Sequence, residues 1–399
     1  MPKPLTTKEI QAVAHYNTIF SQMLKIVPRH ELESCVRAYQ GDKWVKHFSC
    51  WNQFVALLFF QMTGRKSLRD LVLSLSSKSS RLYHLGFRNP KISRSTLSDA
   101  NRQRPYEIYE QFFLRLSRII QGLPQSHGFR FKNKLYAFDA TVVDLCLSLY
   151  QWAGFRKQKG AVKLHTLLNL SGNVPSLVNV TDGKTHEVNM AHRLRFQPGD
   201  IVVWDRAFTD YNLFAAIEAQ QAFFVIRQKA NAAYKILKKL PLPRRVGLLS
   251  DQIIEFTGYY KSQDYPHPLR RIRYRDPESG KTYTYLTNCF NLSPATIAAI
   301  YKQRWQVELF FKWVKQQLKI KSFLGTSENA VKTQIYIALC AYLLLRWLKH
   351  LAKTGLSMLQ ITRLIQINIF ARRRLYDLLT DSPGPLPPSV HGQLILQGF

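Results

Sequence analysis

Three short apolar runs constrain the fold of this 399-residue chain more than any other feature. They lie at 134–138, 201–204 and 222–227, and none of them alternates between apolar and polar residues. Short, uninterrupted apolar runs are typical of strands that are buried on both faces of a sheet. Segments at 186–194 and 211–221 read as helices between them. Because strands and helices alternate here, we predict a mixed α/β fold built around a buried sheet.

Residues 1–125 are predicted to form a separate helical domain. Apolar residues recur at helical spacing at 15–26 and 51–62. Two helices with polar faces are predicted next, at 67–75 and 95–104, and the second opens with Ser and Thr residues that can cap it. Its Asn, Arg and Gln side chains can reach base edges and phosphates. A DNA-binding helix-turn-helix is one interpretation, and a solvated basic helix is the other.

Residues 126–353 are predicted to form the α/β domain, and residues 354–399 a helical segment with a Pro-rich tail. A Ser-Gly-Asn turn at 171–173 predicts a hairpin between strands at 162–170 and 176–180. Residues 229–292 contain Lys-rich and Pro-rich turns and alternating strands at 252–259, 269–275 and 281–287. We therefore predict a β-rich insertion at about 229–292.

The chain carries a formal charge of +32, from 57 Lys and Arg against 25 Asp and Glu, and this excess is spread along its length. A folded body this basic is expected to meet a polyanion, and nucleic acid fits best. A membrane is not expected, because the most apolar run, 336–345, is about half the length of a bilayer span. The N-terminus lacks an apolar signal core and the five cysteines are scattered, so we expect a cytoplasmic protein with reduced thiols.

A long helix at 294–320 combines an apolar face with a basic stripe. At about 100° per residue, Arg304, Glu308, Lys312 and Lys315 fall on one side. The core face of this helix is predicted to consist of Ile300, Val307, Phe310, Phe311, Val314 and Leu318. Taken alone, the stripe favours a solvated face on which Glu308 forms ordinary helical ion pairs.

Two aspartates make a catalytic interpretation stronger. Asp139 and Asp205 each follow a predicted buried strand, at the edge where open α/β sheets place their sites. With Glu308 they would supply three carboxylates, the ligands that hard divalent cations prefer. Two such ions can drive an in-line phosphoryl displacement, and Arg304 and Lys315 could hold DNA phosphates beside them.

Three neighbouring aspartates compete for these roles. Asp144 and Asp200 are predicted to be turn or surface groups, and Asp210 to cap the helix that follows it. For Asp139 and Asp205 themselves, the alternative is a cap or an ion pair.

The spacing of Tyr301, Arg304, Glu308 and Lys315 resembles the signature of the DDE transposases of the insertion-sequence-four (IS4) family. Shorter strings also resemble that family, over roughly residues 8–375: Phe138-Asp139-Ala140-Thr141, Lys163-Leu164-His165, Trp204-Asp205-Arg206-Ala207-Phe208 and Gly325-Thr326-Ser327-Glu328-Asn329-Ala330-Val331. The resemblance implies an RNase H-like catalytic core interrupted by the β-rich insertion and preceded by the helical DNA-binding domain.

The resemblance also implies a mechanism. Asp139, Asp205 and Glu308 would be both the catalytic residues and the ligands of two Mg²⁺ ions, with Mn²⁺ able to substitute. Predicted DNA contacts are Tyr301, Arg304, Lys312, Lys315 and Lys163. The expected partners are double-stranded DNA, as terminal inverted repeats and target, and a second copy of the chain in the DNA complex. The expected reaction is cleavage at the element ends followed by strand transfer.

Two alternatives remain at this point: an RNase H-fold nuclease without strand transfer, and a DNA-binding derivative without catalysis. Some relatives also form a DNA hairpin and trap a flipped base on a tryptophan of the insertion. No tryptophan lies between residues 206 and 304 here, so Tyr259, Tyr260 or Tyr274 would have to stack instead. Trp305 is predicted to be a packing residue.

Overall fold

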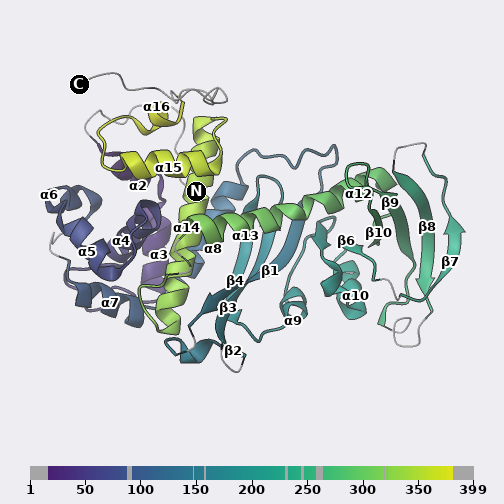
Figure 1. Ribbon diagram of the computed structural model, residues 1–399, viewed down its shortest axis with the longest axis horizontal. Coiled ribbons are helices and arrows are strands. Elements are labelled where there is room, and N and C mark those ends of the chain that lie inside the picture. Colours follow the sequence, from purple (N-terminus) through teal and green to yellow (C-terminus); the bar gives the residue numbers. More distant parts are fainter. Residues whose placement is uncertain are drawn as a thin grey trace, which may run out of the picture.

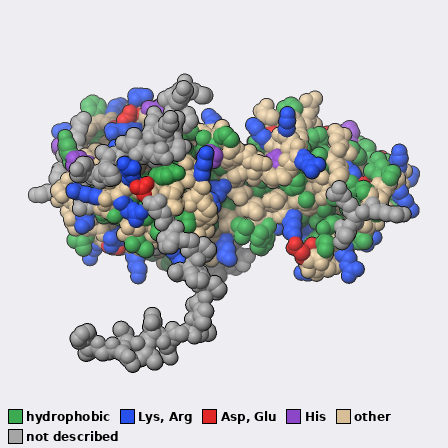
Figure 2. Space-filling model, turned by 90° about the horizontal axis from the view of Figure 1, so that it is seen from above, with side chains coloured by type: hydrophobic (Ala, Val, Ile, Leu, Met, Phe, Trp, Pro, Cys, Tyr) green, Lys and Arg blue, Asp and Glu red, His purple; other side chains and the backbone are tan. Residues whose placement is uncertain are grey.

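The computed structural model describes residues 17–87, 92–146, 148–156, 159–229, 232–243, 247–257, 264–318, 320 and 322–380. The molecule is elongated, with the N-terminal and C-terminal helices at one end and the β7–β10 end of one large sheet at the other (Figure 1). On the face seen in Figure 2, Lys and Arg side chains are scattered over both ends of the molecule, and acidic side chains are fewer there.

The first half of the sheet has the RNase H-like arrangement. It contains β1 (Leu135–Leu145), β3 (Lys159–Asn169), β4 (Val174–Asp182), β5 (Ile201–Trp204) and β6 (Phe223–Arg227). The order is β4-β3-β1-β5-β6, with β3 antiparallel to both of its neighbours and β1, β5 and β6 parallel. A short strand, β2 (Gly154–Arg156), pairs with β3. This confirms the predicted mixed α/β class and the predicted hairpin.

The β-rich insertion extends the same sheet rather than forming a separate one. Its strands are β7 (Tyr234–Lys239), β8 (Leu248–Phe256), β9 (Leu269–Arg275) and β10 (Thr282–Thr287), all antiparallel, and β10 pairs with β6. The sequence analysis found the last three and missed β7, whose exposed, Lys-rich residues give it little apolar signal. Inside the insertion, Arg270 Nη2 lies 2.6 Å from Asp251 Oδ2, and both side chains are buried.

The N-terminal helices are α2 (Ile19–Ile26), α3 (Arg29–Ala38), α4 (Cys50–Thr63), α5 (Leu68–Ser76), α6 (Ser79–Leu82), α7 (Arg94–Gln103) and α8 (Glu107–Gln121), with a 3-10 turn, η1 (Tyr83–Leu85), before α7. The helices predicted at 51–62, 67–75 and 95–104 correspond to α4, α5 and α7. Helix α4 begins at a capping box formed by Ser49 and Asn52 and ends at Gly64, which is left-handed (φ 68°). It is buried along almost its whole length.

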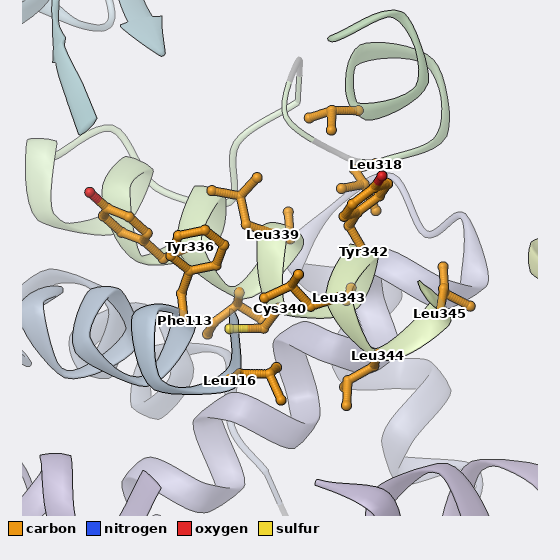
Figure 3. Close-up of a cluster of buried hydrophobic side chains, with 14 of the residues drawn as sticks. Phe113, Leu116, Leu318, Tyr336, Leu339, Cys340, Tyr342, Leu343, Leu344 and Leu345 are labelled. Carbon is orange, nitrogen blue, oxygen red and sulfur yellow. The ribbon is translucent and has the colours of Figure 1, made fainter. Parts of the chain in front are cut away.

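Helix α14 (Glu328–Ala352) is the central helix of the apolar core. In the close-up of Figure 3, its side chains pack against Phe113 and Leu116 of α8 and near Leu318. By length and composition α14 could cross a membrane, but 78% of its most apolar 18-residue window is buried inside the protein. It is therefore explained as a core helix.

Two C-terminal helices complete the helical end of the molecule. Helices α15 (Met358–Asn368) and α16 (Leu375–Thr380) pack beside α14 and α2. The backbone N–H groups of Ile19 and Phe20 donate to the carbonyls of Ala371 and Ile369. The N-terminal and C-terminal parts of the described chain thus lie side by side.

The predicted helix at 294–320 is two helices, α12 (Pro294–Gln303) and α13 (Trp305–Gln317), which cross one face of the sheet (Figure 1). Arg304 joins them with right-handed helical angles but with hydrogen bonds of the tighter i to i−3 type on either side. The other face packs against α9 (Glu187–Ala191) and α10 (Tyr211–Ala219). The short 3-10 turns η2 (Gln151–Ala153) and η3 (Arg206–Phe208) lie in the loops.

The six apolar residues predicted for the core face of this helix pair are all buried. They join the same apolar cluster as Leu135 and Ala137 of β1 and Ile201 and Val203 of β5. The predicted core face is therefore confirmed, and it seats α13 directly over β1.

Candidate active site

Asp139 lies within β1. The prediction that this residue ends a buried strand is therefore wrong. The pairing of β1 with β5 ends at Ala137, just before Asp139. The pairing of β1 with β3 continues to Leu145. The Asp139 side chain is 20% exposed, and its Oδ1 accepts a hydrogen bond from Ala140 N at 2.8 Å. Burial raises the pKa of Asp139 to about 6, although the Ala140 N–H and the Arg304 charge both favour the carboxylate.

Asp205 follows β5 directly, as predicted. In the β1–β5 pairing, Leu135 lies opposite Ile201 and Ala137 opposite Val203. Continuing this register brings Asp139 opposite Asp205, and strand alternation points both side chains toward the face that α12 and α13 cover. Asp205 Oδ1 also accepts a 3.4 Å hydrogen bond from Ala207 N, which caps η3. A capping role and a catalytic role are therefore compatible at this position.

Glu308 lies in the first turn of α13, and one guanidinium connects it to Asp139. Arg304 Nη2 lies 2.6 Å from Glu308 Oε1, and Arg304 Nη1 lies 3.4 Å from Asp139 Oδ2. The Arg304 side chain is 13% exposed and that of Glu308 34% exposed. The guanidinium carbon also lies 5.9 Å from the centre of the Tyr301 ring. Residues from β1 and α13, far apart in sequence, thus meet around a single positive charge.

The donor chemistry of this site fits a divalent ion, because Asp139, Asp205 and Glu308 offer hard carboxylate oxygens. Among the described residues, however, no group of three or more His, Cys, Asp or Glu is arranged to hold a metal ion. The Arg304 guanidinium lies between two of the three carboxylates, where it supplies the positive charge itself. An ion could join Asp139 and Glu308 only if Arg304 moved away from them.

A cavity of about 790 Å³ opens beside these carboxylates. Its lining includes Asp205, Arg304, the site tyrosine Tyr301, Trp305 and several insertion residues. The aromatic and charged side chains from the insertion and β6 are Arg227, Tyr274, Asp276, Tyr283 and Tyr285. The cavity therefore joins the helix motif around Tyr301 and Arg304 to the insertion in one concave surface with both stacking and charged groups.

The aromatic residues of this cavity only partly match the predictions. Trp305 is 54% exposed, so its prediction as a packing residue is wrong. Tyr274 does line the cavity, whereas Tyr259 and Tyr260 lie outside the described residues. The predictions did not include Tyr283 and Tyr285 of β10. Their spacing of two residues in a strand is a signal that they share one face.

The five predicted DNA contacts have different environments. Tyr301 packs with its ring 4.8 Å from that of Tyr285, and Arg304 is paired as described above. On α13, Lys312 is exposed and Lys315 is partly buried. Lys163 is buried, and its Nζ donates to the carbonyl of Thr185 at 2.9 Å. The DNA contacts of all five residues stay predictions.

Glu187 is a charged neighbour of the site that sequence reasoning missed. It opens α9 and lies 3.5 Å from Lys163 Nζ. Its negative charge contributes to the raised pKa of Asp139. A carboxylate followed by an apolar helix gives no local signal of this role, because the contact depends on how α9 packs against β1.

The competing aspartates lie elsewhere. Asp144 is exposed near the end of β1, so it is a surface residue but not a turn residue. Asp200 is buried and its Oδ2 accepts from Gln197 N at 2.9 Å, so it is not a surface group but closes a turn. Asp210 Oδ1 accepts from Leu213 N at 2.8 Å, which confirms the predicted cap of α10.

Comparisons with known proteins identify the family of the chain. A family model described as the transposase DDE domain matches residues 130–344, which is more than half of the chain. A second model, described as a domain of unknown function, matches residues 15–88. The chain belongs to the DDE transposase family.

Curated relatives from three bacteria carry transposase names. A protein of Sinorhizobium fredii named as a transposase is 31% identical over 297 residues, covering 73% of this chain and 81% of the relative. The transposase named for insertion sequence IS5377 of Geobacillus stearothermophilus is 31% identical, covering 69% and 73%. The one named for IS4SA of Synechocystis sp. is 26% identical, covering 74% and 84%.

A solved structure, titled as a piggyBac transposase synaptic complex with hairpin DNA, is also similar. It shares 12% identity and a TM-score of 0.44, with 92% of this chain and 81% of that chain covered. The family assignment rests on the sequence matches. As a DDE transposase with relatives named for insertion sequences, this chain is an enzyme of DNA transposition, and such enzymes generally use divalent metal ions.

Proposed function

We propose that this transposase binds the terminal inverted repeats of a bacterial insertion sequence, cleaves DNA at the element ends and joins the freed 3′-hydroxyl to target DNA. The observation that carries the proposal is the meeting of Asp139 and Glu308 on one guanidinium, beside a cavity that Asp205 lines. Three carboxylates next to a wide, basic, aromatic-lined cavity suit phosphoryl transfer on a polyanion.

Asp139, Asp205 and Glu308 would together hold two Mg²⁺ ions, with Mn²⁺ as a substitute. Such a pair of ions supplies activation of the attacking oxygen and stabilisation of the leaving oxygen. The protein's own contribution is to keep these carboxylates ionised and aligned. The β1–β5 register aligns the two aspartates, and the packing of α13 on the sheet brings Glu308 to them.

The DNA would run across the same face. Arg304 is suited to a bidentate contact with a phosphate, and Lys312 and Lys315 of α13 would act as point charges. Tyr301 and Lys163 complete the set of proposed contacts, and Lys163 acts by holding the site rather than by reaching outward, since it is buried against Glu187.

We assign recognition of the terminal repeats to residues 1–125, where α5 and α7 expose polar and basic side chains. Chemistry is assigned to residues 126–353. Within residues 354–399, helices α15 and α16 of the described part support the helical end. The active form is proposed to be a homodimer that holds two DNA ends in the bacterial cytoplasm. Its cationic surface on both ends of the molecule would favour simultaneous contact with two duplexes (Figure 2).

The proposal is tested with a labelled duplex that carries one terminal repeat and its flank, incubated with the full chain, Mg²⁺ and a target plasmid. Cleavage at the repeat end together with joined product is the expected result. Cleavage without joining would instead support a nuclease, and binding without cleavage would support a non-catalytic DNA-binding protein. Either of these outcomes, with a protein that is folded and binds the repeat, overturns the proposed strand transfer.

A further inference from the structure

We propose that Arg304 is a positioning residue that acts as a built-in counter-charge: it holds Asp139 and Glu308 in the DNA-free protein and releases them when a DNA phosphate takes its guanidinium. Divalent-ion binding would then depend on DNA binding. This inference rests on the proposed function, because it takes Asp139 and Glu308 as metal ligands.

The contacts of Arg304 carry the inference. One terminal nitrogen faces Glu308 at 2.6 Å and the other faces Asp139 at 3.4 Å, so a single planar group links both acids. These oxygens lie against the guanidinium, where a cation shared by the two residues would have to bind. Arg304 and a divalent ion therefore compete for the same negative charge.

The DNA-free site needs such a counter-charge. Asp139 is mostly buried, and the negative charges of Glu187 and Glu308 act on it in addition. Two carboxylates held close without a cation repel each other, and each partial burial increases the cost. The Arg304 pairing relieves this repulsion and keeps Glu308 of α13 directed at β1 before any ion is present.

Arg304 is also positioned so that its guanidinium can move away from Asp139 and Glu308. It lines the 790 Å³ cavity together with Tyr301, Lys302 and Trp305, so a phosphate entering there would meet its guanidinium. Its Nε atom is buried and has no hydrogen-bond partner among the described residues, which leaves one donor of the fork unsatisfied. The helix tightens to i to i−3 hydrogen bonds at this residue, and such mid-helix tightening often marks a hinge.

The test is Mn²⁺ binding to the DNA-free full chain, measured by the loss of the electron paramagnetic resonance signal of free Mn²⁺ at pH 8. Arg304→Gln removes the competing charge and should tighten Mn²⁺ binding on the order of tenfold over the unaltered protein. Arg304→Lys keeps the charge but cannot contact both acids at once, so its affinity should fall between the two. Circular dichroism confirms that each variant is folded.

Arg227→Gln is the matched control. Arg227 lines the same cavity, but its guanidinium lies over the Tyr283 ring at 5.1 Å instead of against the acids. Loss of a general positive charge near the site would strengthen Mn²⁺ binding equally in both Gln variants. Displacement of a direct competitor would strengthen it clearly more in Arg304→Gln.

The outcomes distinguish failure of the counter-charge role of Arg304 from failure of the metal site. Equal or weaker Mn²⁺ binding by Arg304→Gln, when the unaltered protein binds Mn²⁺ and Glu308→Gln does not, overturns the counter-charge role and leaves the metal site intact. The second test adds a terminal duplex and subtracts the Mn²⁺ that the duplex binds by itself. If neither the unaltered protein nor any variant binds Mn²⁺ even then, the metal site itself is overturned.

Discussion

The two sides of the candidate active site are built differently. One side, formed by Asp139 of β1 and Glu308 of α13, rests on the large apolar core around α14. The other side begins at Asp205 and continues into the insertion strands β9 and β10, whose cavity wall is made of tyrosines and charged groups. Apolar packing holds the first side. On the second side Ile272 and Tyr285 join the same apolar cluster, but buried polar contacts such as the Asp251–Arg270 pair also tie the strands together.

This difference suggests a division of labour. A side backed by a close-packed core can hold carboxylates at fixed positions, which metal-assisted chemistry requires. The tyrosine and charged side chains of the insertion strands, which extend the sheet, can adapt to the shape of a DNA end. Changes on the core side should therefore affect chemistry and global stability, whereas changes on the insertion side should affect DNA positioning and local stability.

The largest effect is expected from removing one charge on the core side. Asp139→Asn should lower cleavage of a terminal duplex about 10³-fold or more, roughly 4 kcal/mol of barrier, because it removes a proposed metal ligand. Rates of single-turnover cleavage measure it. The matched control is Asp144→Asn, since that carboxylate is exposed and lies five residues further along the same strand. Similar losses in both variants would contradict the assignment.

The apolar core should respond globally. Leu339→Ala in α14 removes a fully buried side chain and should lower the free energy of unfolding by about 4 kcal/mol. Urea unfolding followed by circular dichroism measures this change. Leu73→Ala, at a side chain that is 71% exposed, is the control and should change it by less than about 0.5 kcal/mol. Equal effects of the two would mean that α14 is not the central support.

The insertion should respond locally. Asp251→Asn leaves the buried Arg270 charge without its partner, which should cost about 3 kcal/mol, with Arg270 still donating to the carbonyls of Phe290 and Leu292. Hydrogen exchange should speed up in β8 and β9 while α4 and α14 keep their protection. Uniform loss of protection across all four elements would show that the insertion and the core unfold as one unit.

A smaller, pH-dependent effect is expected at Asp139 itself. Burial raises its pKa from 3.8 to about 6, so the folded state prefers the protonated form and ionisation costs stability as the pH rises through this window. Asp139→Asn should therefore be more stable than the unaltered protein by about 2–3 kcal/mol at pH 8 and by almost nothing at pH 3.5. Urea unfolding at both pH values tests this, and a gain of equal size at both would contradict the raised pKa.

The sequence predicted most of the structure that depends on local pattern. The apolar face of α12 and α13 and the buried runs of β5 and β6 are fixed by residue spacing. The placement of Asp139 and Asp205 near one edge of the sheet could be anticipated because both follow short apolar runs. The family signature then predicts Glu308 as the third acid, although spacing alone could not separate it from an ordinary helical ion pair.

What the sequence missed depends on long-range packing. Asp139 was predicted to end a strand because the apolar run at 134–138 stops there, yet pairing with β3 extends β1 to Leu145. No glycine or proline marks the interruption between α12 and α13 at Arg304. The interruption coincides with the ion pairs that the Arg304 side chain forms with two acids. Burial of Lys163 and exposure of Trp305 likewise follow from neighbours that are distant in the chain.

The most direct test of the central claim is anomalous scattering from Mn²⁺ in crystals of the chain bound to a terminal duplex. We predict ions within about 2.0–2.4 Å of carboxylate oxygens of Asp139, Asp205 and Glu308, with Arg304 turned to a DNA phosphate. Ions bound away from these three residues, or a complex in which Asp205 stays beyond ligand distance of any ion that Asp139 and Glu308 hold, would contradict the account.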